Sequence, residues 1–535
     1  MAATAPALYK NAAASWDAPC FEVDTMLRRI TSLACTLFLA AVSASSSTRA
    51  PLVRLDDATV IGFTEGPSTS FLGIPFAQPP IGKLRLQLPQ PIARYTGVIN
   101  ATTFGNQCIQ QITTQPTFPP GLPPEIPPFV ASLAELVDVP QSEDCLNINV
   151  IVPAGTRPGD GFPVAAVSTM LYGRSFHEDF HPTANLQWIY GGGFQVGSNA
   201  VRPGAVIVNR SIELGAPVIF VSMNYRLNAF GFLGGREIQK AGLGNLGLHD
   251  QREALRWVQK HISAFGGDPS KVTIWGQSAG SHSVALQMIT NGGDTEGLFR
   301  AGWMESGSAP PTGSILKLQP TFDYIVLETG STHPRRQRRK HSLRDRTAAE
   351  VAAYAKSNYF PNASDATIAR LLELYPGNPA AGSPFGTGDQ FAFTPEYKRL
   401  AAFQGDFMFQ ATRRFFLDQR AGKQVVRSFP LLGVPTHALF PARTDISPTA
   451  LPDWQAHTSE LANVFGGGDM TDFLVRFVNT FDPNGGPQIH WPEYSPDAPQ
   501  SLAFVEGTPD LTIIADTFRK EATDFLTQLS LAEPF

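Results

Sequence analysis

Features that would place this chain in a membrane or on nucleic acid are absent. No apolar run reaches the roughly 18 residues of a membrane-spanning helix, so no membrane span is predicted. Basic residues are in the minority, with 41 Lys and Arg against 46 Asp and Glu, and the net charge of -5 gives no reason to expect nucleic acid or an anionic membrane as partner. There is no internal repeat and no extended low-complexity tract. A globular protein remains, and its 43% hydrophobic content allows a large core.

A leader pattern lies close to the amino terminus, but not at it. From Met26 the sequence reads Met-Leu-Arg-Arg, followed by an apolar run over residues 30–42 and small residues through Ala44. This is the layout of a secretory signal peptide, which belongs at the start of a chain. We therefore expect residues 1–25 to be a spurious upstream extension, residues 26–44 to be a signal peptide, and the protein to be secreted. A buried helix over the apolar run is the alternative.

Cysteine is scarce, with four in 535 residues. Cys20 and Cys35 precede or fall within the predicted leader, which leaves Cys108 and Cys145 in the mature chain. An exported chain meets oxidising conditions, in which cysteines can pair. Asn-x-Ser/Thr sequons, consistent with glycosylation along the secretory route, are a further sign of export. They begin at Asn100, Asn209 and Asn362.

One short motif nominates a catalytic residue. Residues 276–280 read Gly-Gln-Ser-Ala-Gly, and they follow the β-rich run Val-Thr-Ile-Trp at residues 272–275. A Gly-x-Ser-x-Gly motif between a strand and a helix holds its serine on a sharp, strained turn that only small neighbours tolerate. We expect a strand over residues 272–275, a helix over residues 281–288, and Ser278 as the nucleophile between them.

Four further segments extend this pattern along the chain. They read Glu-Asp-Cys-Leu-Asn-Ile-Asn-Val at residues 143–150, Trp-Ile-Tyr-Gly-Gly-Gly-Phe at 188–194, Asn-Tyr-Arg-Leu at 224–227 and Gly-Asn-Leu-Gly-Leu-His-Asp-Gln at 244–251. Together with residues 265–280 they resemble the signatures of the type-B carboxylesterases and lipases, the cholinesterase-like branch of the α/β-hydrolases. The resemblance covers roughly residues 52–330 and 350–530, and is strongest to secreted fungal members.

The resemblance implies a single domain over residues 45–535 with the α/β-hydrolase fold. In that fold helices flank a central, mostly parallel sheet, and a carboxyl-terminal helix would occupy residues 511–530. The implied activity is hydrolysis of carboxylic esters, by a carboxylesterase or lipase, through an acyl-enzyme. No cofactor is implied, and the expected partner is a small-molecule or lipid ester.

The resemblance also assigns roles to individual residues. His457 stands in a segment similar to the family's histidine motif and would be the general base, in the chain order serine, acid, histidine. The amides of Gly192, Gly193 and Ala279 would form the oxyanion hole, because a glycine-rich backbone can aim donors at the developing charge. The matching cysteine pair of the family forms a disulfide, here Cys108 with Cys145.

The loop between these cysteines carries a hint about the substrate. It is rich in proline over residues 116–128, and apolar residues then recur at helical spacing from Phe129 to Val137. In lipases that this chain resembles, the corresponding loop is a lid whose apolar face lines the acyl site. Residues 116–139 would then touch a lipid interface transiently. An ordinary surface helix packed on the core is the alternative, so lipase and soluble esterase both stay open.

The acid of the catalytic triad is missing from its expected place. The family's acid loop reads roughly Gly-x-x-x-Asp-Glu-Gly-Thr, and no such string occurs between Ser278 and His457. The interval is short by family standards, and residues 331–347 hold a basic run instead. Three interpretations compete: a nucleic-acid or nuclear-localisation patch, a solvated surface loop, and a misread frame that hides the acid loop. The alternative function is therefore a catalytically impaired or non-catalytic cholinesterase-like protein.

A second anomaly interrupts a predicted strand. Pro-Val-Ala-Ala at residues 163–166 should run directly into Trp188, but residues 167–187 intervene, and we interpret them as a retained intron. This segment contains His-Glu-Asp-Phe-His at residues 177–181, which matches the zinc motif His-Glu-x-x-His. That motif requires a helix, and Pro182 follows at once, with no third ligand downstream. No metal site is predicted.

Overall fold

The computed structural model describes residues 50–111, 139–160, 185–200, 204–329, 347–382, 392, 395–430, 460–505 and 510–534. The chain divides after Arg49, and every described residue belongs to the unit that begins at Ala50. Several predictions fall outside the described residues. These are the upstream extension and signal peptide, the loop over residues 116–137, most of the basic run, the His-Glu-x-x-His motif, and His457.

The strands of the described chain form three sheets. The central sheet has seven strands in the order β3-β4-β6-β8-β7-β9-β10, and two smaller sheets have the orders β1-β2-β5 and β11-β12. The strands are β1 Leu52–Leu55, β2 Asp57–Ile61, β3 Phe63–Glu65, β4 Ser68–Pro75, β5 Thr96–Asn100, β6 Asn147–Pro153, β7 Asn185–Ile189, β8 Ile219–Met223, β9 Val272–Gln277, β10 Ala301–Glu305, β11 Gln500–Phe504 and β12 Leu511–Ala515.

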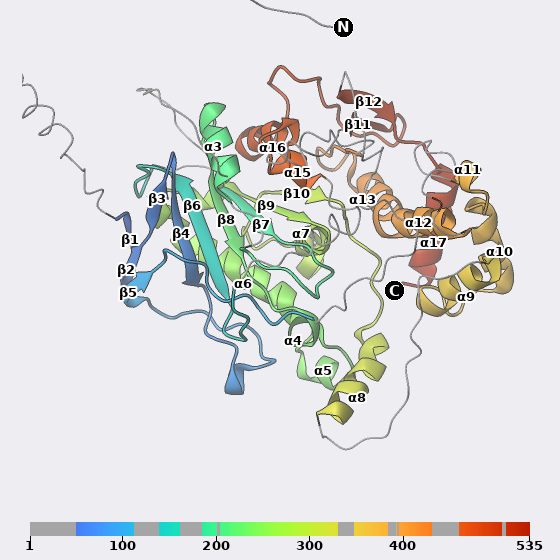
Figure 1. Cartoon of the computed structure of the whole chain (residues 1–535), viewed down its shortest axis with the longest axis horizontal. Coiled ribbons are helices and arrows are strands. Elements are labelled where there is room, and N and C mark those ends of the chain that lie inside the picture. Colours follow the sequence, from blue (N-terminus) through green and yellow to red (C-terminus); the bar gives the residue numbers. More distant parts are fainter. Residues whose placement is uncertain are drawn as a thin grey trace, which may run out of the picture. The chain divides into compact units, whose positions relative to one another are not determined.

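The central sheet changes its pairing across its width (Figure 1). The neighbours β8, β7, β9 and β10 are parallel, whereas β3, β4, β6 and β8 pair antiparallel. Every residue of β6, β8 and β9 is buried, as expected for apolar strands that are covered on both faces. Sites in α/β proteins lie at the carboxyl ends of parallel strands, so the parallel half of the sheet positions the candidate residues.

Helices cover the central sheet in packed pairs. Helix α3 contacts β4, β6 and β8 and packs on α16, whereas α7 contacts β7, β9 and β10 and packs on α6. The helices are α3 Ala205–Glu213, α4 Asn228–Phe232, α5 Arg236–Ala241, α6 Leu246–His261, α7 Ala279–Ile289, α8 Gln319–Glu328, α9 Ala348–Asn358, α10 Asp365–Leu374, α11 Pro379–Gly382, α12 Tyr397–Gly405, α13 Ala411–Arg420, α15 Leu461–Val464, α16 Asp469–Thr480 and α17 Lys520–Ala532.

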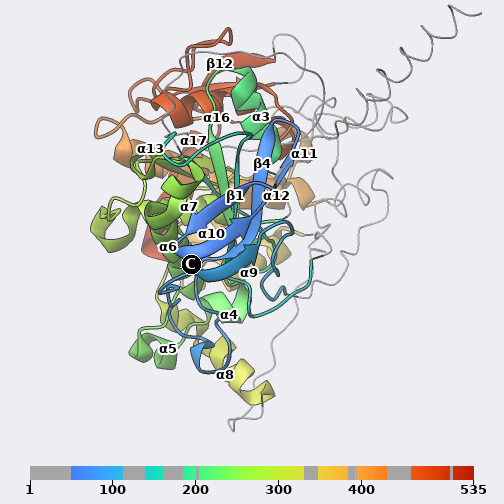
Figure 2. The same ribbon diagram turned by 90° about the vertical axis from the view of Figure 1, so that its left-hand side faces the viewer.

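A second hydrophobic core lies among the later helices. Figures 1 and 2 show α9, α10, α12 and α17 grouped together, and their shared core includes the fully buried Phe360 and Phe403. A π-helical turn over Asp406–Gln410 joins α12 to α13. The buried Asp406 pairs with Arg519 at 2.6 Å, which fixes this turn to the start of α17.

The structure corrects one predicted element and refines two others. The carboxyl-terminal helix over residues 511–530 is wrong in its first part, because Leu511–Ala515 is rich in isoleucine and pairs antiparallel with β11. Helix α7 starts at Ala279, earlier than predicted, since the strand before it ends at Gln277 and Ser278 alone makes the turn. Strand β7 begins at Asn185, so the last three residues of the segment 167–187 pair with β8 and β9.

Candidate active site

Ser278 stands on a strained turn between β9 and α7. Its backbone angles are φ 56° and ψ -123°, which a residue with a side chain rarely adopts. The flanking glycines have no room for a β-carbon: one on Gly276 would lie 2.3 Å from the carbonyl carbon of Gly280, and one on Gly280 would lie 1.9 Å from the Ile189 oxygen. The Gly-x-Ser-x-Gly sequence is therefore required by packing as well as by the turn.

Two backbone hydrogen bonds hold this turn in place. The Ser278 amide donates to the Glu305 carbonyl of β10 at 2.9 Å, and the His282 amide donates to the Ser278 carbonyl at 2.9 Å. The turn is therefore fixed by the neighbouring strand on one side and by the first turn of α7 on the other. The expected oxyanion donor Ala279 is the first residue of α7 and is buried, so its amide lies at the positive end of the helix dipole.

The glycine-rich loop after β7 lies directly against the nucleophile. A β-carbon on Gly191 would come within 2.8 Å of Ser278 Cβ and 2.6 Å of Gln277 Oε1, so only glycine fits there. The next residues Gly192, Gly193 and Phe194 all have positive φ, at 111°, 62° and 60°. Glycine tolerates such angles readily, so the loop can turn sharply just after the residue that lies against Ser278.

A stacked pair of buried tyrosines anchors the start of this loop. The rings of Tyr190 and Tyr225 stack with their centroids 4.4 Å apart. The Tyr225 hydroxyl donates to the Tyr190 carbonyl at 2.7 Å, and the Tyr190 hydroxyl donates to the Tyr225 carbonyl at 3.0 Å. Because Tyr190 directly precedes Gly191, these bonds fix where the glycine loop leaves β7. The far end is held by the Asn228 amide, which donates to the Phe194 carbonyl at 2.7 Å.

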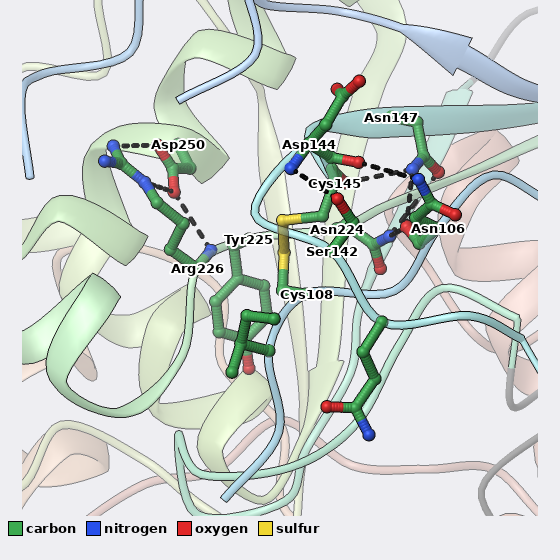
Figure 3. Close-up of a disulfide and its surroundings, with 12 residues drawn as sticks. Asn106, Cys108, Ser142, Asp144, Cys145, Asn147, Asn224, Tyr225, Arg226 and Asp250 are labelled. Carbon is green, nitrogen blue, oxygen red and sulfur yellow. Dashed lines mark hydrogen bonds and ion pairs between the residues drawn. A yellow bond between two sulfur atoms is a disulfide. The ribbon is translucent and has the colours of Figure 1, made fainter. Parts of the chain in front are cut away.

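A disulfide supports the same loop from outside (Figure 3). Cys108 and Cys145 are joined, with their α-carbons 5.0 Å apart. Two residues further on, the Gln110 side chain accepts a hydrogen bond from the Gly197 amide at 2.6 Å and donates to the Gly197 carbonyl at 3.0 Å. The segment next to the disulfide is thus hydrogen-bonded to the end of the glycine-rich loop.

Figure 3 also shows two polar clusters around this disulfide. Arg226, which is 3% exposed, makes a two-bond ion pair with the fully buried Asp250 of α6 at 2.7 and 2.8 Å. On the other side, the side-chain amides of Asn147 and Asn224 both donate to the backbone carbonyl of Asn106. Such satisfied buried groups hold the ends of β6 and β8 in one arrangement.

His457, the predicted general base, lies outside the described residues, but a residue shortly after it contacts the turn that carries Ser278. Glu460, three positions later, is 1% exposed. Gln277 Nε2 donates to Glu460 Oε1 at 3.3 Å, and the Ser306 hydroxyl donates to the same oxygen. The residue beside the nucleophile is thus hydrogen-bonded to the segment that carries the predicted base.

Two ionisable groups near the turn have shifted pKa values. Burial raises the pKa of Glu305 well above its usual value, and the charge of Glu460 raises it further. Burial lowers the pKa of His282, although the hydrogen bond with the Ser308 carbonyl opposes this. That bond is 2.5 Å long, and since a carbonyl only accepts, His282 Nδ1 carries the proton.

A cavity of about 910 Å³ lies beside β10 rather than over the nucleophile. Its lining includes residues 300–304 and 306–308 on one side, residues 424–430 on another, and parts of α12 and α13. Ser306 and Glu460 line it close to the turn, but Ser278 is not among the lining residues.

The predicted sequons differ in exposure. Asn100 and Asn362 are exposed, whereas Asn209 is partly buried within α3. The serine of the Asn209 sequon, Ser211, is fully buried, and its hydroxyl donates to the Val208 carbonyl at 2.6 Å. Exposure therefore favours the first and third sites along the chain.

The described residues contain no group of three or more His, Cys, Asp or Glu side chains that is arranged to hold a metal ion. No helix in the described part of the chain is long and apolar enough to cross a membrane.

Two features of the site were not predicted from the sequence. They are the buried carboxyl groups Glu305 and Glu460 near Ser278, and the stacked pair of Tyr190 and Tyr225. Glu305 gave one available signal, since it ends the otherwise uncharged strand Ala-Gly-Trp-Met-Glu. Tyr190 and Tyr225 gave none, because their contact joins the ends of β7 and β8, which are far apart in the sequence.

Comparison with known proteins agrees with this geometry. The family model described as the carboxylesterase family matches residues 49–370. Lipase 4 of Diutina rugosa is 32% identical, over 85% of this chain and 91% of that protein. Secreted lipase 1 of Botryotinia fuckeliana is also 32% identical, over 88% of this chain and 91% of that protein.

The fold has a solved counterpart in EstA of Aspergillus niger. That structure aligns with a TM-score of 0.70 and 23% identity, over 92% of this chain and all of the other. The α/β-hydrolase fold predicted from the sequence is confirmed by this likeness and by the matching family model. On these grounds the chain belongs to the carboxylesterase family and is a carboxylic ester hydrolase.

Proposed function

We propose that this chain hydrolyses esters through an acyl-enzyme formed on Ser278. The observation that carries the proposal is the close packing of the glycine loop on the nucleophile turn, with 2.8 Å from a β-carbon on Gly191 to Ser278 Cβ. A serine on a strained turn, beside backbone with successive positive φ angles, is the arrangement that acyl transfer needs.

The mechanism proceeds in two halves. His457 takes the proton of Ser278 while the hydroxyl oxygen attacks the ester carbonyl, and the amides of Gly192, Gly193 and Ala279 stabilise the negative oxygen. The alcohol leaves with the proton returned by His457. Water, activated by the same histidine, then attacks the acyl-enzyme and releases the carboxylic acid, which restores Ser278.

The missing acid gives a second candidate function, an impaired esterase. In a serine triad the acid orients the histidine, and its loss lowers kcat by about 10⁴. No residue is assigned to that role here. If residues 331–347 come from a misread frame and residues 167–187 from a retained intron, transcript sequencing will show a different frame after Gly330 and a message without codons 167–187. A transcript that encodes both segments as given would favour the impaired esterase.

The substrate and location follow from the relatives. Both proteins compared above are named lipases, and one is named a secreted lipase, which supports a lipid ester as substrate and a place outside the cell. The signal peptide over residues 26–44 would direct this export. The loop over residues 116–139 would contact the lipid interface, so activity should rise when a long-chain ester passes its solubility limit.

The direct test compares hydrolysis of a p-nitrophenyl ester by the wild type and by Ser278→Ala. We expect the variant to lose about 10⁶ in kcat, because the covalent step is removed. Ser270→Ala is the matched control, since Ser270 is exposed at the opposite end of β9 from Ser278, where its hydroxyl donates to Asp268, the cap of a short 3-10 turn. A fluorophosphonate probe should label Ser278 in the wild type.

The outcomes separate the two functions. Hydrolysis that depends on Ser278 supports the acyl-enzyme mechanism. Absence of both hydrolysis and labelling in a folded protein would reject it and support the impaired esterase. Equal activity in Ser278→Ala would show that another residue carries the reaction.

A further inference from the structure

Two buried carboxyl groups lie behind the nucleophile turn. Glu305 ends β10, is 0% exposed, and stands opposite Gln277 in the parallel register of β9 and β10. Glu460 is 1% exposed and is hydrogen-bonded to Gln277 and to Ser306, the residue after Glu305. The proposed reaction uses neither carboxyl group directly.

The surroundings of Glu305 favour its uncharged form. Burial is the largest effect, and it outweighs the neighbouring indoles of Trp303 and Trp275, which favour the charged form; Trp303 Nε1 donates to Glu305 Oε1 at 2.8 Å. Within the described chain no ion pair joins Glu305 to a basic side chain. Arg300 and Arg413 line the neighbouring cavity, but they bind the Val478 carbonyl and Asp516 instead.

The ionisable neighbour of Glu305 increases this preference. Glu460, at the start of α15, is the charged group that bears on it, and two like charges in a buried site oppose each other. On α7, His282 is buried and kept neutral by a lowered pKa, so it supplies no compensating charge. An isolated buried carboxylate is unfavourable, so the proton stays on Glu305.

We propose that Glu305 is a positioning residue held as the neutral carboxylic acid, and that its neutrality lets β10 lie close to both Ser278 and the segment that carries His457. The Glu305 carbonyl oxygen accepts a hydrogen bond from the Ser278 amide at 2.9 Å, so a shift of the Glu305 backbone also moves Ser278. An ionised Glu305 would repel Glu460 and separate the nucleophile turn from the segment of the base. The positioning role rests on the proposed function, whereas the neutral state does not.

The protonation state is tested by infrared spectroscopy at neutral pH. The wild type should show the carbonyl band of an un-ionised carboxylic acid, and Glu305→Gln should lack it. Glu328→Gln is the matched control, since Glu328 is exposed on α8, and it should leave the band unchanged. A wild-type spectrum without the band, or a band that survives in Glu305→Gln, would overturn the proposal.

Thermal unfolding against pH gives a second readout that needs no activity. A carboxyl whose folded pKa is raised contributes stability below its unfolded pKa of about 4.5 and loses that contribution as pH rises toward the folded pKa. Glu305→Gln removes this loss. The melting temperature of the variant should therefore rise relative to that of the wild type as pH increases from 4 to 7. A difference that stays constant over this range would contradict a neutral Glu305.

The positioning role is tested by kinetics on a soluble ester. Glu305→Gln preserves the shape and neutrality, so kcat should stay within about twofold, whereas Glu305→Ala should lower kcat by at least about tenfold with little change in KM. Unchanged kcat in Glu305→Ala would overturn the positioning role. If the wild type shows no hydrolysis that depends on Ser278, the proposed function fails, while the infrared and unfolding results still decide the state of Glu305.

Discussion

A β-carbon placed on Gly191 would lie 2.8 Å from the β-carbon of Ser278, closer than two such atoms approach in proteins. The glycine loop and the nucleophile turn therefore fit together only when residue 191 has no side chain. This contact joins two segments that are separated in the sequence by the helices α3, α4, α5 and α6 and by the strands β8 and β9. It makes the position of the glycine loop depend directly on the position of Ser278.

Gly191→Ala should separate these two parts. The added methyl group must push the loop away from Ser278 and Gln277, and a displacement near 1 Å lowers kcat by about 10². Steady-state hydrolysis of a short ester measures the effect. Gly405→Ala is the control, because a β-carbon there meets nothing within 4 Å, and this variant should keep full activity. Wild-type activity in Gly191→Ala would show that the loop is not an oxyanion hole.

Tyr225→Phe should weaken the anchor of the glycine loop. It removes the hydroxyl that donates to the Tyr190 carbonyl at 2.7 Å and leaves that buried oxygen unsatisfied. The free energy of unfolding should fall by about 1–3 kcal/mol, and kcat should fall with it. Chemical denaturation and kinetics check this. Tyr324→Phe, at a residue that is 56% exposed, should change neither quantity.

Replacing Cys108 and Cys145 by serine should lower both stability and activity. Loss of a native disulfide costs about 2–5 kcal/mol in a small secreted domain, and Gln110 would no longer be held beside Gly197. Gln110→Ala separates the two effects, since it should reduce kcat while the disulfide still stabilises the fold. Equal kcat in all three proteins would show that the clamp on the loop does not serve catalysis.

The buried Asp516 should give the fold an acid-sensitive element. Burial alone would raise its pKa, but the ion pairs with Arg413 and Arg414 outweigh burial and lower the pKa to about 2. A lowered folded pKa contributes stability above the unfolded value of 3.8, and that stability is lost as pH falls toward 2. Unfolding measured across this range should show the loss in the wild type.

Asp516→Asn should remove that acid dependence at a cost in stability. The two arginines lose their charged partner, so the free energy of unfolding at neutral pH should fall by about 3–5 kcal/mol. The difference from the wild type should shrink as pH drops from 4 to 2. A difference that is the same at both ends would contradict the lowered pKa.

Glycosylation should occur at the exposed sequons and not at every sequon in the sequence. In secreted protein from a glycosylating host, Asn100→Gln and Asn362→Gln should each remove one glycan mass, because both asparagines are exposed. Asn209→Gln should remove none, since Ser211 of that sequon is fully buried in α3. Intact-mass spectrometry before and after glycosidase treatment measures this. A glycan on Asn209 would show that modification precedes the burial of α3.

The main elements of the site could be predicted because they follow local rules. A β-rich run before Gly-x-Ser-x-Gly specifies a strand, a turn and a helix within one short stretch, and the structure has β9 and α7 there. The predicted start of the carboxyl-terminal helix at residue 511 was wrong, because a resemblance to a family indicates only roughly where an element lies. Whether Leu511–Ala515 is strand or helix depends on its partner β11.

The sequence by itself determined the family and the turn that carries the candidate nucleophile Ser278, since these depend on residues next to each other in the chain. Only the tertiary structure decided what surrounds that turn. The approach of Gly191 to Ser278, the stacked Tyr190 and Tyr225, and the buried Glu305 beside Glu460 all join residues that are far apart in the sequence. Such contacts are set by the order and register of the strands in the sheet, and no local spacing in the sequence encodes them.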